Sequence, residues 1–201
     1  MFIALAVLLV VFVIAFATFL IWTRKMDIES FKKFCQKKVK RIAKRNNLLV
    51  LPDLNISNYD SEKLLINHVI FGKKYIYLIS DFMLKGFVSG EANDNSWVYY
   101  NNIKKTNHYL SNLNMISEKN IRDFSGILGI SSDPIVSICL IPNECDFKIN
   151  KSEDERKIIV HYSSLARKIK EFENQEIGSL NQTQIYEHFK TIENKNNEER
   201  H

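Results

Sequence analysis

The first apolar segment of the chain is long and carries no charge. Residues 2–22, FIALAVLLVVFVIAFATFLIW, contain one hydroxyl group, that of Thr18. As a helix this segment would be about 31 Å long, at about 1.5 Å per residue, which matches the hydrocarbon core of a bilayer. The pattern therefore predicts a transmembrane anchor over residues 1–23.

A cleaved signal peptide is the alternative for this segment, because Ala15-Phe16-Ala17 offers a small-x-small cleavage site. However, no Lys or Arg precedes the apolar run, and cleavage there would leave the apolar sequence TFLIW at the new terminus. On these flanking features we favour the anchor.

An amphipathic pattern follows the apolar run. Residues 27–45 place apolar side chains at three- and four-residue steps, the period of a helix with one buried face. These side chains belong to Ile28, Phe31, Cys35, Val39 and Ile42. Asp27 and Glu29 suit the N-terminal turn of a helix. We interpret residues 24–46 as a basic juxtamembrane helix that is also the first helix of the domain.

Short segments of strand and helix character make up the rest of the chain. The predicted strands cover residues 47–51, 64–71, 75–79, 85–90, 96–100, 134–141 and 158–161. The predicted helices cover residues 115–128, 163–173 and 182–193. The polar, Asn-rich stretch 101–114 is typical of a loop or an irregular helix, and residues 194–201 of a charged, disordered tail. This order predicts one α/β domain over residues 47–193, with a central mixed sheet flanked by helices.

The net charge of the chain comes from one segment. The 201 residues carry a formal charge of +5 and 45% are hydrophobic, an ordinary globular composition. Residues 23–50 hold ten Lys and Arg against two Asp and Glu, a balance of +8. The remaining 18 basic and 21 acidic residues leave the body at −3, which argues against a generally basic nucleic-acid-binding domain.

The position of the basic residues also predicts orientation. Positive residues close to a membrane span are retained on the cytoplasmic side, so we expect a single-pass cell-membrane protein with its N-terminus outside and its domain in the cytoplasm. The helix would present a patch formed by Lys32, Lys33, Lys37, Lys38, Lys40, Arg41, Lys44 and Arg45. This patch suits the anionic inner leaflet, while nucleic acid, or solvent alone, are the alternatives.

The cysteines indicate neither disulfides nor zinc. Cys35, Cys139 and Cys145 are an odd number, without a C-x-x-C pair or Cys/His spacing suited to a metal. No Gly-rich phosphate loop is present either, so the sequence predicts no cofactor and no resident metal. The frequent Lys, Asn and Ile suggest a bacterial source with an AT-rich genome.

The stretch 67–97, NHVIFGKKYIYLISDFMLKGFVSGEANDNSW, resembles the core of the nuclease-related domain, or NERD, family. The positions in register are Ile66, His68, Val69, Gly72, Ile76, Ile79, Gly86, Val88, Gly90 and Trp97. The resemblance extends over about residues 30–192 and implies a restriction-endonuclease-like fold. It rests on glycines, aromatic residues and the order of hydrophobic segments.

The same register implies that the nuclease chemistry has been lost. Members of this fold hold Mg²⁺ with an Asp and with an acidic residue two positions before a Lys, so that the metal activates water and the Lys orients it. These positions fall on Asn67, Ser80 and Phe82. We therefore expect a catalytically inactive binding or scaffolding module rather than an enzyme.

Two alternatives remain at this point. An active, Mg²⁺-dependent nuclease would need relocated ligands, for which Asp81, Lys85 and Glu91 are the candidates, although Asp81 should face away from Ser80 along a strand. A sequence-independent nucleic-acid tether would use the basic helix instead. His68 has no acidic neighbour in the sequence, so we expect it to be structural.

Overall fold

The computed structural model describes Val13 and residues 27–149, 154–175 and 180–200. Within these residues, no helix combines the length and the apolar character that crossing a bilayer requires. Apart from Val13, the anchor predicted over residues 1–23 lies outside the described residues.

A mixed five-stranded sheet lies at the centre of the fold. Its order is β1 (Leu49–Pro52), β2 (His68–Phe71), β3 (Ile76–Asp81), β7 (Ile135–Ile141) and β9 (Lys157–His161). Strand β2 is antiparallel to both neighbours, whereas β3, β7 and β9 run parallel. Every residue of β7 is buried, as its continuous apolar run and flanking prolines predict.

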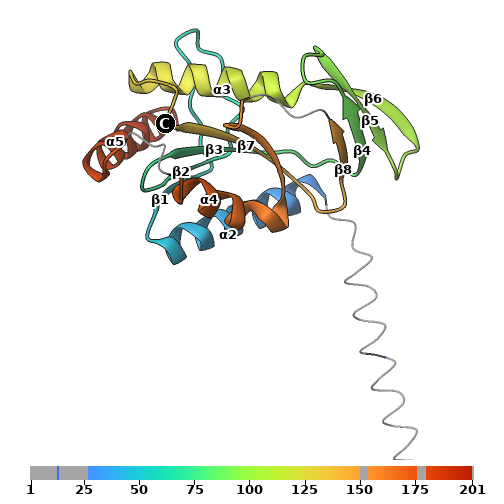
Figure 1. Ribbon diagram of the computed structural model, residues 1–201, viewed down its shortest axis with the longest axis horizontal. Coiled ribbons are helices and arrows are strands. Elements are labelled where there is room, and N and C mark those ends of the chain that lie inside the picture. The colour runs from blue at the N-terminus through green and yellow to red at the C-terminus, as the bar shows by residue number, and fades with distance from the viewer. Residues whose placement is uncertain (1–12, 14–26, 150–153, 176–179, 201) are drawn as a thin grey trace, which may run out of the picture.

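Helices cover both faces of this sheet (Figure 1). On one face, α2 (Ile28–Asn46) and α4 (Leu165–Glu173) bury their apolar side chains against Tyr77, Ile79 and Val136. On the other, α3 (Leu113–Leu128) and α5 (Gln182–Glu198) pack on Phe71, Leu78 and neighbouring residues. The result is a three-layer α/β/α arrangement, which confirms the predicted mixed α/β class.

A second sheet lies beside the first and was not predicted. Its order is β6 (Thr106–Ser111), β5 (Ser96–Asn101), β4 (Gly86–Gly90) and β8 (Asp146–Ile149). The parallel pair β3 and β7 of the central sheet continues through short connections into the parallel pair β4 and β8. The expectation of one central sheet was therefore incomplete.

Two sequence-based predictions are wrong for identifiable reasons. The polar stretch 101–114 is not a loop, because β5 and β6 form a hairpin in which exposed polar residues line an edge strand. The tail predicted from residue 194 is helical as far as Glu198. That last turn is held because the buried Asn196 accepts a hydrogen bond from the Asn55 amide and Glu199 accepts one from Ser57.

Helix α2 follows its predicted pattern closely. It begins after Asp27, whose carboxylate caps the helix by accepting from the Ser30 amide at 2.7 Å, and ends at Asn47 in the left-handed conformation. Cys35 and Val39 are fully buried on the central sheet. The helix is thus part of the domain, with its opposite side left to solvent.

Two glycines that match the NERD pattern are required by the second sheet. Gly86 has φ of 139°, and a Cβ atom there would lie 2.1 Å from the carbonyl oxygen of Tyr100. A Cβ atom on Gly90 would lie 2.2 Å from the indole ring of Trp97. These glycines serve the fold whether or not any catalytic chemistry is present.

Candidate functional site

A buried hydrogen bond between a histidine and an aspartate joins β2 to β3. His68 Nε2 lies 3.0 Å from Asp81 Oδ2, and the two side chains are 2% and 0% exposed. Because β2 and β3 are antiparallel with His68 opposite Ile79, Asp81 stands two residues further along the same face of the sheet. That face is the one covered by α2, so the thiol of Cys35 packs against the same carboxylate.

The hydrogen bonds around His68 define its tautomer. The ring accepts from the backbone amide of Asp53 at Nδ1, at 3.3 Å, so this nitrogen carries no proton. Nε2 therefore carries the proton, and its N–H donates a hydrogen bond to Asp81 Oδ2. Both ring nitrogens are engaged within the protein, and neither is available to a substrate as a general base.

The cluster of Cys35, His68 and Asp81 combines residue types found in nucleophilic active sites. Burial, followed by the charge of Asp81, raises the pKa of the Cys35 thiol well above its ordinary value. A catalytic thiol needs the opposite shift and access to substrate, whereas Cys35 is fully buried. The cluster therefore acts as an internal polar contact, in agreement with the structural role expected for His68.

The sequence could have revealed this pair. The strands predicted over residues 64–71 and 75–79 are separated by three residues, a spacing typical of a hairpin, and the register of such a hairpin brings His68 and Asp81 to one face. The expectation that His68 lacks an acidic partner considered only its neighbours along the chain.

The positions that match the nuclease motif are used for contacts inside the protein. Asn67 Oδ1 accepts a hydrogen bond from the Asp81 amide at 2.7 Å. The Ser80 hydroxyl donates to the carbonyl of Leu65 and accepts from Asn120 Nδ2 at 3.3 Å. Phe82 is half-buried against the apolar core of the second sheet. As expected from strand alternation, Ser80 faces α3 while Asp81 faces α2.

The three relocated candidates do not form one site. Asp81 is sealed beneath α2, whereas Glu91 lies in the exposed turn after β4 and its amide donates to Asp94 Oδ2 at 2.8 Å. Lys85 precedes β4, and its backbone amide and carbonyl both bond the Tyr99 hydroxyl. At about 3.3 Å per residue, the Cα atoms of Gly86 and Gly90 at the two ends of β4 are about 13 Å apart, and Lys85 and Glu91 lie beyond opposite ends of this strand.

No grouping of three or more His, Cys, Asp and Glu suited to a metal ion occurs among the residues that the structure describes. Asn67 and Ser80 offer neutral oxygens that are already bonded, and Asp81 faces the opposite side of the sheet. The donor set around the matched positions therefore does not fit Mg²⁺, which favours carboxylate ligands and bound water.

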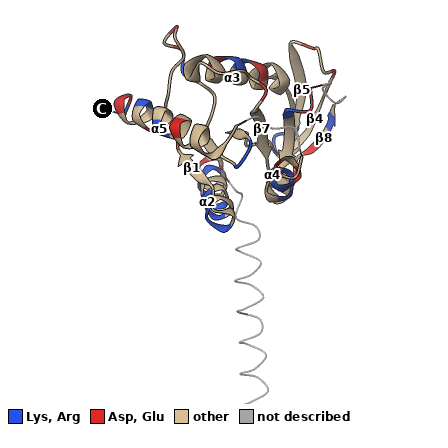
Figure 2. Ribbon diagram, turned by 60° about the vertical axis from the view of Figure 1, so that its left-hand side comes forward, with Lys and Arg blue, Asp and Glu red and all other residues tan. Residues whose placement is uncertain are grey.

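The predicted basic patch is exposed along α2, with one exception (Figure 2). The exposed members are Lys32, Lys33, Lys37, Lys40, Arg41, Lys44 and Arg45. Lys38 instead bonds the carbonyls of Tyr162 and Ser163, and its ammonium lies 4.1 Å from the centre of the Tyr162 ring. Burial lowers the pKa of Lys38, so this residue connects α2 to the segment before α4 rather than serving the patch.

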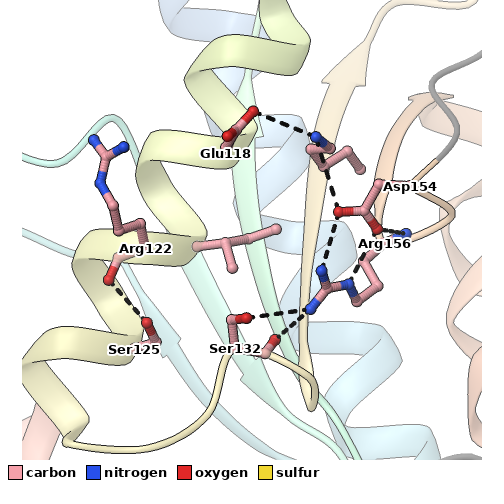
Figure 3. A pocket seen from close by; sticks show the side chains of 8 residues that line it. Glu118, Arg122, Ser125, Ser132, Asp154 and Arg156 are labelled. Carbon is pink, nitrogen blue, oxygen red and sulfur yellow. Dashed lines mark hydrogen bonds and ion pairs between the residues drawn. The ribbon is translucent and has the colours of Figure 1, made fainter.

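A pocket of about 340 Å³ lies between α3 and the start of β9 (Figure 3). Its charged side chains are already paired. The Arg156 guanidinium bonds Asp154 and the carbonyl of Ser132, and Lys157 lies 3.4 Å from Glu118. The Arg156 guanidinium beside Asp154 lowers the pKa of that carboxyl against the effect of burial. The cationic groups that line the pocket are thus engaged in ion pairs, and the pocket offers no ready anion site.

Comparison with known proteins adds no relative. No protein-family model matches the chain, and neither the curated proteins nor the solved structures contain a match.

Proposed function

We propose that this chain is a membrane-anchored binding or scaffolding module, with a cytoplasmic domain related to the NERD family and without nuclease chemistry. The mixed central sheet between helices is compatible with the restriction-endonuclease-like fold that the resemblance implies. The glycines at matched positions support it as well, because the packing of the second sheet requires them.

The proposal that nuclease activity is absent rests on one observation. The matched positions are filled by side chains that turn inward, with Asn67 bonding the Asp81 amide and Ser80 bonding Leu65 and Asn120. The nearest carboxylate, Asp81, is committed to His68 and excluded from solvent. A phosphodiester and a metal would have to break these contacts before they could meet any acidic group.

The membrane part of the proposal rests on charge. Helix α2 buries one face in the domain and exposes seven basic residues on the remainder. A lipid surface rich in anionic headgroups is the partner that such a face suits, with each basic residue near it worth about 1 kcal/mol. A nucleic-acid tether draws on the same exposed charges, and it is the second candidate.

A cleavage assay on the full-length chain in lipid nanodiscs tests the catalytic part. Single- and double-stranded DNA and RNA are incubated with Mg²⁺ or Mn²⁺, with EDTA controls. We expect no chelator-sensitive cleavage from folded protein. Cleavage that persists through repurification and disappears in Lys85→Ala or Glu91→Gln would overturn the proposal, since both substitutions change exposed or half-exposed side chains and should leave the fold intact.

A further inference from the structure

The β6 strand forms an open edge of the second sheet. It pairs with β5 alone, and five of its six residues are exposed. Figure 1 places β6 at the outer end of the molecule, away from α5. Tyr109 in the middle of β6 is 86% exposed, more than any other large hydrophobic side chain that the structure describes.

This edge lacks the features that discourage pairing with another strand. Proteins protect edge strands with charged residues or proline. Of the other edge strands described, β1 contains Pro52, β9 contains Lys157, and β8 contains Asp146 and Lys148. The sequence of β6, TNHYLS, contains neither proline nor a Lys, Arg, Asp or Glu.

The hydrogen-bond pattern shows which backbone groups of β6 face outward. The Asn112 amide donates to the Asn95 carbonyl, one position beyond the pair formed by Ser96 and Ser111. Hydrogen-bonded pairs alternate along an antiparallel ladder, so Thr106, His108 and Leu110 bond to β5. The amides and carbonyls of Asn107, Tyr109 and Ser111 therefore point away from the sheet.

We propose that β6 is a self-association edge, at which two copies of this chain pair through antiparallel β6 strands centred on Tyr109. This register uses all three outward-facing residues of each copy. It places Tyr109 opposite the partner copy's Tyr109 and Asn107 opposite Ser111, with these side chains on one face. An isologous contact of this kind closes on itself as a two-fold dimer.

Charge favours a second copy as the occupant. The hairpin tip beside β6 carries Lys104 and Lys105, while the turn at the opposite end of the strand carries Glu91 and Asp94. Antiparallel pairing brings the basic tip of each copy toward the acidic end of the other. The strand itself carries no Lys, Arg, Asp or Glu, so two identical edges meet without repulsion between such charges although the chain has a formal charge of +5.

Disulfide trapping of the full-length chain in detergent tests both the contact and its register. The native cysteines that would interfere, Cys35, Cys139 and Cys145, are all buried. In the proposed register, residue 109 of one copy and residue 109 of the other form a hydrogen-bonded pair, with Cα atoms about 5.5 Å apart. The two thiols that Tyr109→Cys introduces are therefore within reach of a disulfide. Ile103→Cys, at the exposed tip of the same hairpin, is the matched control and should not cross-link.

A second variant separates the strand edge from association through other parts of the chain. Tyr109→Pro removes an outward-facing amide and leaves the β5–β6 hydrogen bonds in place, whereas Tyr109→Ala keeps the amide. We expect sedimentation to give a dimer for the native chain and a roughly ten-fold or larger increase in its Kd for Tyr109→Pro, beyond that for Tyr109→Ala. A native chain that is monomeric, a dimer indifferent to Tyr109→Pro, or equal cross-linking through Ile103→Cys would overturn the proposal.

Discussion

His68 Nε2 and Asp81 Oδ2 are 3.0 Å apart in the interior of the protein, beneath helix α2. The pair connects two neighbouring strands and contacts the Cys35 thiol of the covering helix. Asp81 Oδ1 is buried and has no hydrogen-bond partner among the described residues, so His68, the Cys35 thiol and the contact of the Asp81 amide with Asn67 hold the carboxylate in position. A carboxylate held in this way is excluded from solvent and is withdrawn from chemistry.

Removing one member of this pair should be strongly destabilising. His68→Ala leaves a buried carboxylate without its donor, and we expect a loss of about 3 kcal/mol in the free energy of unfolding. Asp81→Asn should cost less, because an amide oxygen can still accept from His68. Urea denaturation followed by circular dichroism measures both, with Glu91→Gln as an exposed control expected to stay within about 0.5 kcal/mol. A His68→Ala variant as stable as that control would show that the pair has no structural role.

Ser80 and Asn120 should prove energetically coupled. Ser80 and Asn120 both bond the Leu65 carbonyl and one another, and both are buried. We expect Ser80→Ala and Asn120→Ala each to lower the free energy of unfolding by about 1 kcal/mol, and the double variant to lose less than the sum of the two.

A matched test concerns catalysis at this position. Ser80→Glu introduces the acidic residue that the NERD motif carries at this position, but it places a carboxylate among buried partners. It should destabilise the protein and yield no metal-dependent cleavage in the nuclease assay. Gain of cleavage in a folded Ser80→Glu variant would indicate that a metal site survives around it.

The central layers were predictable because their pattern is periodic. The spacing of Phe31, Cys35 and Val39 predicts the buried face of α2, and the apolar run 134–141 predicts a strand buried on both sides. The second sheet was missed in part because β6 is a polar, exposed edge strand without clear hydrophobic alternation, and because β8 alternates over only four residues.

In the candidate site, too, some contacts could be predicted from the sequence and others could not. Strand alternation correctly predicted that the side chains of Ser80 and Asp81 face opposite sides of the sheet. It could not show that Lys38 leaves the basic patch, since that depends on where Tyr162 lies after a chain separation of 124 residues. Pairings set by tertiary packing carry no local signal in the sequence.

The three thiols should make the protein less stable at alkaline pH. Burial raises the pKa of Cys139 to about 12 and that of Cys145 to about 11, and it also raises the pKa of Cys35. The unfolded chain therefore loses these protons at lower pH than the folded one, starting near the ordinary thiol pKa of about 8.5. The stabilisation is complete below that pH and declines as the pH rises toward 11.

Denaturation between pH 7 and 10.5 measures this decline. A Cys145→Ala variant should lose less stability over the same range than the native chain. Thiol labelling with a disulfide reagent at pH 8.5 gives an independent measure, since all three cysteines should react only after unfolding. Rapid labelling of the folded protein would contradict the burial of these groups.

Lys37 and Lys38 are neighbours in the sequence, but their substitution should affect different properties: the stability of the fold for Lys38 and binding to lipid for Lys37. Lys38 bonds the segment before α4, so Lys38→Ala should lower the free energy of unfolding by about 1 kcal/mol. Lys37 is exposed, so Lys37→Ala should leave stability unchanged within about 0.5 kcal/mol.

On a fragment without residues 1–23, Lys37→Ala should instead weaken binding to vesicles with 30% anionic lipid by roughly five-fold, whereas Lys38→Ala should change it little. Vesicle flotation and fluorescence anisotropy with duplex DNA, each at several salt concentrations, then compare the two partners on the same variants. Tighter binding to DNA than to the vesicles at physiological salt, lost in Lys37→Ala, would favour the nucleic-acid tether over the membrane face.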